Sequence, residues 1–424
     1  MATGSFIGWI DMRASDLELA RDYLRRLEEG TVDELGFGIV RDHFSERFFP
    51  ATSTVMSIAR QYVLVPFCCL HLADRIRAER GWSTPKAVAE LHALENHLRL
   101  RVTGYRKEDV LRQASTIYWP ALRKLRVFEG SGAIASYLRH VVESAGRGYR
   151  DDDGMAHLDD ADAGLWDPDL LRLYAKEKDD LIPEGGNRFG FRDPDDTEVN
   201  GRLTASEARY LRDVYRRHQA EHGPSIMSHV LDLGIDAEFA YPWEAACPDE
   251  LRDVVDHAQR FSMVAAGARL VYARLLLEER EHRGLPKPPA PDYRACFSTW
   301  WRAARDRIRH WDLDAFKGHA GTSLRRSRDD EQFLALFQAE TRSYGSAASF
   351  FDSPAVHEMV ARREKRVRPQ KSRLRNPKYL EQWKPFDLAV DSPGCAYGLD
   401  FRADKASGLC TEILQGLRRR GGSA

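Results

Sequence analysis

The sequence contains few cysteines, and their spacing does not suggest a disulfide framework or a zinc site. Its six cysteines are spread over 424 residues, and none forms a Cys-x-x-Cys pair. We therefore expect neither a disulfide-stapled domain nor a zinc finger. Cys68 and Cys69 are adjacent within the apolar run 63–70, which predicts that both are small core residues.

Long apolar runs are also missing. No stretch approaches the roughly 18 apolar residues that a membrane-spanning helix requires. The first ten residues have no basic region followed by a long apolar core, so they do not resemble a signal peptide. We expect a cytoplasmic protein that has no membrane partner.

Several motifs for catalysis and cofactor binding are absent as well. The sequence has no GxxxxGK[ST] loop, no GxGxxG after a strand, no HExxH and no GxSxG. The 14 histidines are scattered, and His92 and His97 are five residues apart, which is a poor ligand spacing on a helix. The acids after Pro168-Asp169 do not have the spacing of a PD-(D/E)xK nuclease. We therefore expect no metal and no cofactor.

The charge balance limits how the chain can attract a partner. Apolar residues make up 43% and charged residues 30%, which is an ordinary globular composition. The formal net charge is −1, so affinity for a polyanion must come from local separation of charge.

Helical patterns and capping signals dominate the sequence. Thr204 with Glu207 forms a capping box, and Ser353-Pro354 places an N-cap before a proline at the first helical position. The predicted fold is mainly α, a helical body with one or two helix-turn-helix or winged-helix units. We expect five regions: an N-terminal helical segment with candidate active-site motifs (1–80), a winged-helix-like unit (81–150), an acidic linker or excursion (151–200), a helical domain (201–285) and a C-terminal helical domain with a basic tract (286–424).

The basic tract, residues 362–378, is the strongest local signal. It concentrates arginines and lysines against a single acid, Glu364. Such a density suits a polyphosphate, because each phosphate contact releases a counterion. The alternative is a solvated helix face followed by a loop. The candidate DNA contacts in this tract are Arg363, Arg366, Lys371, Arg373 and Asn376.

A second candidate for DNA binding spans residues 107–126. The pattern predicts a helix, a polar turn at residues 114–116 and a second helix that carries Tyr118, Trp119 and Arg123. This order is typical of a helix-turn-helix unit. The alternative is a pair of packed helices with Tyr118 and Trp119 in the core.

The segment 33–60 is the candidate active site, because it mixes polar side chains with apolar ones. The predicted core residues of this segment include Phe37, Ile39, Val40 and Phe44. A carboxylate here can activate water or stabilise a cationic sugar. The alternative is a set of surface ion pairs, such as Arg41 with Glu46. The candidate acids are Asp42 first, then Glu34 and Asp33, and the candidate substrate contacts are Arg41, Thr52, Ser53, Thr54 and Arg60.

Several short motifs along the chain carry a resemblance to a known family. They are Phe6–Asp11, Asp33–Gly38, Arg41–Phe44, Phe49–Thr54, Ser115–Trp119, Arg363-Glu364, Ser372–Asn376 and Leu399–Arg402. In this order they resemble a bacterial family of phage-defence loci, long catalogued only as a domain of unknown function. The resemblance implies a DNA glycosylase that removes glucosylated hydroxymethylcytosine from phage DNA and leaves abasic sites.

The sequence departs from that family pattern at three positions. Ala51, Ile58 and Gln61 stand where glycine, arginine and tyrosine are expected, whereas Arg60 is retained. The modification that this chain recognises can therefore differ from that of the family. A glycosylase must extrude its target base and stack it, and Tyr118 or Trp119 is the predicted stacking group.

The predicted function is thus excision of a modified cytosine from double-stranded phage DNA. Two alternatives remain open at this stage. The first is a non-catalytic DNA-binding regulator or sensor of a defence locus, and the second is a nuclease. The sequence leaves the oligomeric state and any protein partner open.

Overall fold

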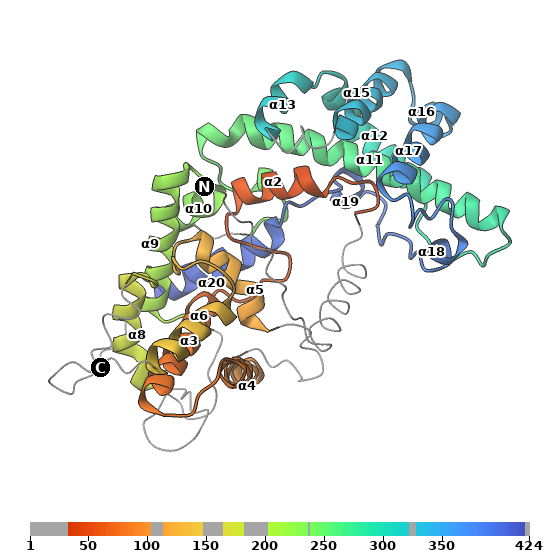
Figure 1. Ribbon diagram of the computed structural model, residues 1–424. Coiled ribbons are helices and arrows are strands. Elements are labelled where there is room, and N and C mark those ends of the chain that lie inside the picture. The colour runs from red at the N-terminus through yellow and green to blue at the C-terminus, as the bar shows by residue number, and fades with distance from the viewer. Residues whose placement is uncertain are drawn as a thin grey trace, which may run out of the picture. The chain divides into compact units, whose positions relative to one another are not determined.

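The computed structural model describes residues 33–102, 113–146, 164–181, 202–235, 238–321 and 328–419. In these ranges the regular structure is helical (Figure 1), apart from a single antiparallel bridge between Phe128 and Trp166. The prediction of a mainly α fold is therefore confirmed. The motif Phe6–Asp11 and residues 107–112 lie outside the described ranges. Among the described helices, none is both long and apolar enough to cross a membrane.

The chain forms two compact units, each built from segments that are far apart in the sequence. Unit 1 consists of Met1–Val40, Met263–Leu313 and Gly321–Gly398, and unit 2 of Arg41–Ser262, Asp314–Ala320 and Leu399–Ala424. The described helices are α2 (Gly38–Phe48), α3 (Gln61–Ala78), α4 (Thr84–Val102), α5 (Ala114–Lys124), α6 (Ile134–Gly146), α8 (Pro168–Leu181), α9 (Ala205–His222), α10 (Ile226–Leu233), η2 (Pro242–Glu244), η3 (Asp249–Leu251), α11 (Arg252–His282), α12 (Tyr293–Arg309), α13 (Leu313–Ala320), α15 (Arg328–Ser343), α16 (Ala347–Phe351), α17 (Pro354–Val367), α18 (Pro377–Glu381), α19 (Pro393–Ala396) and α20 (Ala403–Arg418).

Aromatic side chains fill the interior of unit 1. Helix α12 packs against α15, α16 and α19, and its Trp300 is fully buried beside Phe297 and Phe337. The indole N–H of Trp300 donates to the Met263 carbonyl at 2.7 Å. Gly267 on α11 leaves room for this ring, since a Cβ atom at that position would lie 2.4 Å from it. The size of Trp300 therefore fixes how closely α12 approaches α11.

Unit 2 is built around α3, which packs against α4, α5, α6 and α8. The apolar run 63–70 is buried along its whole length, which confirms Cys68 and Cys69 as core residues, and neither is part of a disulfide. Helix α20 packs against α9 and α10. The predicted capping box at the start of α9 is also confirmed, because Thr204 Oγ1 accepts from the Glu207 N–H at 3.1 Å and Glu207 accepts from the Thr204 N–H at 2.7 Å.

The predicted polar turn at residues 114–116 is wrong. These residues form the first turn of α5, and the Ser115 N–H donates to the buried Glu95 carboxylate at 3.0 Å. Ser115, which in isolation resembles a turn residue, thus finds a hydrogen-bond partner in the protein interior. Tyr118 and Trp119 on the same helix are both buried. The described residues contain no strand pair that would form the wing of a winged helix.

One part of the region predicted to be an acidic linker or excursion, residues 151–200, needs correction. Part of the predicted acidic linker, Pro168–Leu181, is a helix, α8, which packs against α3 and α9. Asp167 provides its cap by accepting from the Asp169 N–H at 2.9 Å.

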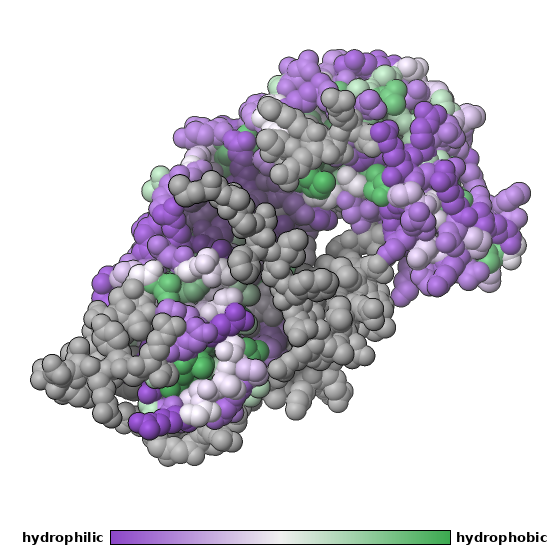
Figure 2. All heavy atoms as spheres, viewed as in Figure 1, coloured by the Kyte–Doolittle hydropathy of each residue, from purple (hydrophilic) through white to green (hydrophobic). Residues whose placement is uncertain are grey.

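The surface of the described residues carries few large apolar side chains. On the face drawn in Figure 2, hydrophilic residues cover most of that surface and hydrophobic ones are scattered. Ile39 was predicted to be in the core but is 52% exposed. The reason is helical periodicity: Val40 and Phe44, four residues apart, share the buried side of α2, and Ile39 lies off that side.

Gly36 allows the segment 33–37 to approach α17 closely within unit 1. Its φ is +72°, a conformation that favours glycine, and a Cβ atom there would lie 2.9 Å from Val367 Cγ2. Gly36 therefore meets two constraints, one of backbone conformation and one of space.

The first prediction separates these two constraints. Gly36→Ala should lower the free energy of unfolding by about 2–4 kcal/mol, since the left-handed backbone costs ~1–2 kcal/mol and overpacking a similar amount. Gly81, with φ +85° and nothing within 4 Å of a built Cβ, is the matched control for the backbone term alone. Gly81→Ala should cost only about 1–2 kcal/mol in urea unfolding. Equal losses in the two variants would show that the contact with Val367 is unimportant.

A buried carboxylate–arginine cluster as the candidate functional site

Two predicted segments from opposite ends of the chain meet inside unit 1. The Arg373 guanidinium, in the basic tract, forms an ion pair with the carboxylate of Glu34. Both side chains are largely buried, with exposed fractions of 12% and 9%. The pair joins residues that are 339 positions apart, so it brings the tract to the segment that the sequence predicts to be the active site.

Glu364, near the end of α17, determines where Arg373 lies. Its side chain is fully buried and accepts hydrogen bonds from the Ser372 hydroxyl, from the Arg373 N–H at 2.6 Å and from the Tyr272 hydroxyl at 3.2 Å. The Arg368 N–H closes α17 by donating to the Glu364 carbonyl at 2.9 Å. The chain therefore folds back immediately after the helix, and Arg373 is aimed at Glu34.

The pKa of Glu34 lies above the usual range of a carboxyl group, mainly because the side chain is buried. Burial raises the pKa of Glu34 to about 6, against the opposing charges of Arg373, Arg368 and Arg269. The negative charge of Glu364 acts in the same direction as burial. A carboxyl with this pKa is about nine-tenths ionised at pH 7 and can still take up a proton, as a general base requires.

One carboxylate oxygen of Glu34 has no partner. Oε1 binds Arg373, whereas Oε2 is buried and has no hydrogen-bond partner. Buried polar atoms are normally satisfied, and an exception asks for an explanation such as a catalytic role. Other buried side-chain atoms in the described part of unit 1 also have no partner, among them Arg368 Nη1, Arg363 Nη1 and Asp330 Oδ2. We name Glu34, Glu364, Arg368, Arg373 and Tyr272 the Glu34 cluster.

Arg363, another predicted DNA contact, lies beside this cluster in the interior. Its guanidinium pairs with Asp330 and donates to the carbonyls of Leu35 at 2.7 Å and Gly36 at 3.2 Å. It also lies over the ring of Phe37, at 5.2 Å from the centroid. Arg363 thus holds the backbone next to Glu34 in place.

The remaining predicted contacts of the tract lie nearer the surface. Arg366, Arg375 and Lys378 are exposed, whereas Lys371 is half-buried. Asn376 is the N-cap of α18, and its side chain accepts from the Lys378 N–H at 3.1 Å. The exposed cations of the tract and the buried Arg373 therefore belong to one continuous segment.

The structure places Asp42, the first choice from sequence, in a different setting. In unit 2 its carboxylate is 48% exposed and pairs with Arg41 at 3.1 Å and Arg402 at 3.2 Å. Arg402 also donates to the Thr52 carbonyl at 2.6 Å. In unit 1, Asp33 accepts from the backbone N–H of Phe37 at 2.8 Å and from that of Gly38, and so caps the start of α2. Of the three candidate acids, Glu34 is the buried one.

The other candidates of unit 2 serve the packing of that unit. Arg60 and Glu207 form a buried ion pair at 3.0 Å. Tyr118 Oη donates to the Ile58 carbonyl at 2.8 Å, and Trp119 Nε1 donates to the Gly132 carbonyl at 3.1 Å.

The remaining candidates of unit 2 differ in their exposure to solvent. Thr54 and Arg123 are exposed, and Ser53 is half-buried. Thr52 is buried and donates to the Phe49 carbonyl at 2.7 Å.

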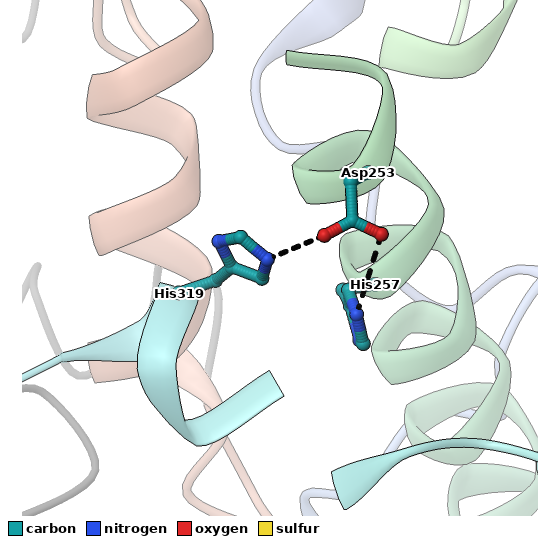
Figure 3. A group of neighbouring side chains, drawn as sticks. All are labelled: Asp253, His257 and His319. Atoms are coloured by element: carbon teal, nitrogen blue, oxygen red, sulfur yellow. Dashed lines mark hydrogen bonds and ion pairs between the residues drawn. The ribbon is translucent and has the colours of Figure 1, made fainter. Parts of the chain in front are cut away.

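A second group, which the sequence analysis missed, lies in unit 2. Asp253 and His257 are on α11, and His319 is on α13 (Figure 3). His319 Nε2 is 2.7 Å from Asp253 Oδ2, and His257 Nε2 is 3.7 Å from Asp253 Oδ1. The i,i+4 spacing of Asp253 and His257 was a visible signal, but His319 follows only after another helix.

The comparisons with known proteins place the chain in a family. A family model described as "Family of unknown function (DUF6361)" matches residues 4–175 and 194–415. The chain belongs to this family. The match includes both Glu34 and Arg373, so the Glu34 cluster lies within the part that the family model covers. No curated protein and no solved structure matches the chain.

The second prediction concerns the pH dependence of stability. Because the pKa of Glu34 rises from 4.5 to about 6 on folding, the folded state retains this proton at a higher pH than the unfolded state. The contribution of Glu34 to stability therefore increases as the pH falls through 6 and is complete below 4.5. When the pH is lowered from 7 to 5, the free energy of unfolding of the parent protein should increase by on the order of 1 kcal/mol through Glu34. Glu34→Gln should lack this increase.

Urea unfolding of both proteins at the two pH values measures this difference. Glu279→Gln, which removes a carboxylate paired with Arg283 at 2.5 Å in the same unit, is the control for the loss of an acid–arginine pair. It should keep the gain that comes from Glu34. The assignment fails if Glu34→Gln and the parent respond identically to pH.

Proposed function

We propose that this chain is a DNA glycosylase that hydrolyses the N-glycosidic bond of a modified cytosine in phage DNA. The observation that carries the proposal is the pairing of Arg373, from the basic tract, with the buried Glu34. The tract offers exposed cations to phosphates, and the same segment reaches a carboxylate whose pKa lies near neutrality. The identity of the base comes from the family resemblance of the sequence motifs.

The chemistry requires an anion close to the sugar. Hydrolysis adds the hydroxyl of water to the anomeric carbon and a proton to the departing base, and the sugar is cationic at the transition state. The ionised Glu34 stabilises that charge or takes the proton from the attacking water. Its free Oε2 is the atom suited to this role, because Oε1 is already bound to Arg373.

The neighbours of Glu34 keep it ionised and in position. Without the positive charges of Arg373, Arg368 and Arg269, burial would raise the pKa of Glu34 further. Arg373 is in turn oriented by Glu364, which accepts its backbone N–H at 2.6 Å. Glu364 is therefore a positioning residue, and Glu34 is the proposed catalytic residue.

The DNA substrate is held by the exposed part of the tract. Arg366, Arg375 and Lys378 present their charges to solvent, and such side chains neutralise phosphates without reading sequence. The target nucleotide must leave the stack to bring its sugar to Glu34. Binding therefore includes an opening of the protein or the DNA that admits the sugar to the buried carboxylate.

The third prediction tests the carboxylate. Glu34→Gln keeps the shape of the side chain and removes its charge, so base release from modified phage DNA should fall about a hundredfold or more in single-turnover assays. Glu279→Gln is the matched control, because it removes a carboxylate that pairs with an arginine of unit 1 outside the Glu34 cluster. It should lose stability in a thermal melt yet retain base release. Asp42→Asn should change base release and thermal stability little, since the ion pairs of Asp42 are half-exposed.

Alkali treatment of the products separates the possible activities. Breaks that appear only after alkali are abasic sites and support the glycosylase. Direct breaks that depend on added Mg²⁺ would make the protein a nuclease, and binding without any break would make it a regulator or sensor. A folded Glu34→Gln protein with normal base release would falsify the role of Glu34.

The fourth prediction tests the tract as a DNA contact. Reversing Arg366, Arg375 and Lys378 to Glu should weaken DNA binding for all sequences and reduce the slope of log affinity against log salt by about 2–3. The matched control reverses three exposed cations of unit 1 outside the tract, Lys287, Arg302 and Arg342. If both triple variants lose affinity equally, only the total charge matters and the tract is not the interface.

A further inference from the structure

Three side chains of types that bind metal ions converge in unit 2, and the proposed function uses none of them. Asp253 lies in the first turn of α11, and His257 follows one turn later on the same face. His319 lies near the end of α13 and points its ring at Asp253, as Figure 3 shows. One ligand atom from each of the three side chains lies within 4.8 Å of the other two.

Neighbouring contacts fix these side chains in place. The His319 carbonyl is 3.0 Å from His43 Nε2, which ties down the end of α13. On the same helix, Phe316 is fully buried and stacks on Phe261 with ring centroids 5.6 Å apart. His257 is buried and its ring lies 5.1 Å from that of His319. Both imidazoles are therefore presented by packed elements.

The donor set and the distances suit a metal ion of one class. Two imidazole nitrogens and one carboxylate oxygen are ligands of borderline divalent transition metals such as Zn²⁺, which bind at about 2.0–2.2 Å. In a tetrahedral site, such bonds put ligand atoms roughly 3.3–3.5 Å apart. In the structure each oxygen of Asp253 faces one imidazole: Oδ2 is 2.7 Å from His319 Nε2, and Oδ1 is 3.7 Å from His257 Nε2. Small rotations of the carboxylate and the His319 ring are then enough to seat an ion.

Exposure leaves one side of the group accessible. The Asp253 side chain is 70% exposed, whereas that of His257 is almost fully buried. An ion there would have protein ligands on its inner side and water on its outer side. Three protein ligands and an open position are common for zinc.

We propose that Asp253, His257 and His319 bind a single divalent transition-metal ion, with water completing its coordination, and that this ion fastens α13 to the start of α11. Asp314–Ala320 belongs to unit 2, although the residues that flank it along the chain belong to unit 1. The ion would join this short segment, through His319, to Asp253 and His257 on α11. Because the ion binds only the folded protein, its binding adds to the stability of the unit.

The fifth prediction is tested on the full chain after chelation and dialysis, with Co²⁺ and Zn²⁺ as probes. Co²⁺ should bind one ion per chain with a visible d–d absorption band, and equimolar Zn²⁺ should displace it. Zn²⁺ should raise Tm by about 2 °C or more, as expected for a ligand that binds only the folded state. Mg²⁺, which prefers an all-oxygen octahedral shell, should neither displace Co²⁺ nor raise Tm.

Variants assign the ion to these residues. His319→Ala and Asp253→Asn should both lose the absorption band and the Tm shift, while far-UV circular dichroism confirms that they are folded. His229→Ala, a half-buried histidine of the same unit outside the group, is the matched control and should keep both. Absence of stoichiometric binding to the parent, or unchanged binding in His319→Ala, overturns the proposal. These readouts do not depend on base release, so this test and the test of Glu34 can fail separately.

Discussion

The site in unit 1 depends on a single buried acid, Glu364. Its carboxylate accepts hydrogen bonds from the hydroxyls of Ser372 and Tyr272 and from the backbone N–H of Arg373. A buried charge is stable only when such donors surround it, so the chain after α17 must fold back to supply them. This reversal turns a run of like charges into a structured segment. Arg373 then meets Glu34, and Arg363 from the same helix holds the neighbouring carbonyls.

Much of the fold could be predicted from sequence, because helix signals are local. The capping box of Thr204 and Glu207, and the start of α17 at Ser353-Pro354, depend on a few adjacent residues and form as predicted. One of the errors came from a polar residue that finds its partner inside the protein. Ser115 resembled a turn residue only because the sequence does not show the carboxylate of Glu95 beside it.

The candidate site could be predicted in its parts but not in its assembly. Sequence patterns indicated both the segment that holds Glu34 and the basic tract, yet nothing local indicates that Glu34 and Arg373 pair. Sequence also ranked Asp42 above Glu34, since burial, which distinguishes the two acids, depends on distant packing. In the same way, aromatic side chains on a helix fit a stacking role or a core role equally, and Tyr118 and Trp119 lie in the core of unit 2.

The discontinuous make-up of unit 1 has a consequence for biosynthesis. Glu34 belongs to the first segment of that unit, whereas its partner Arg373 belongs to the last. A ribosome makes the chain from its N-terminus at about 5–20 residues per second. Glu34 therefore leaves the ribosome well before Arg373 and has an ordinary solvated carboxylate while most of the chain is made. Glu34 therefore acquires its raised pKa only when synthesis is nearly complete.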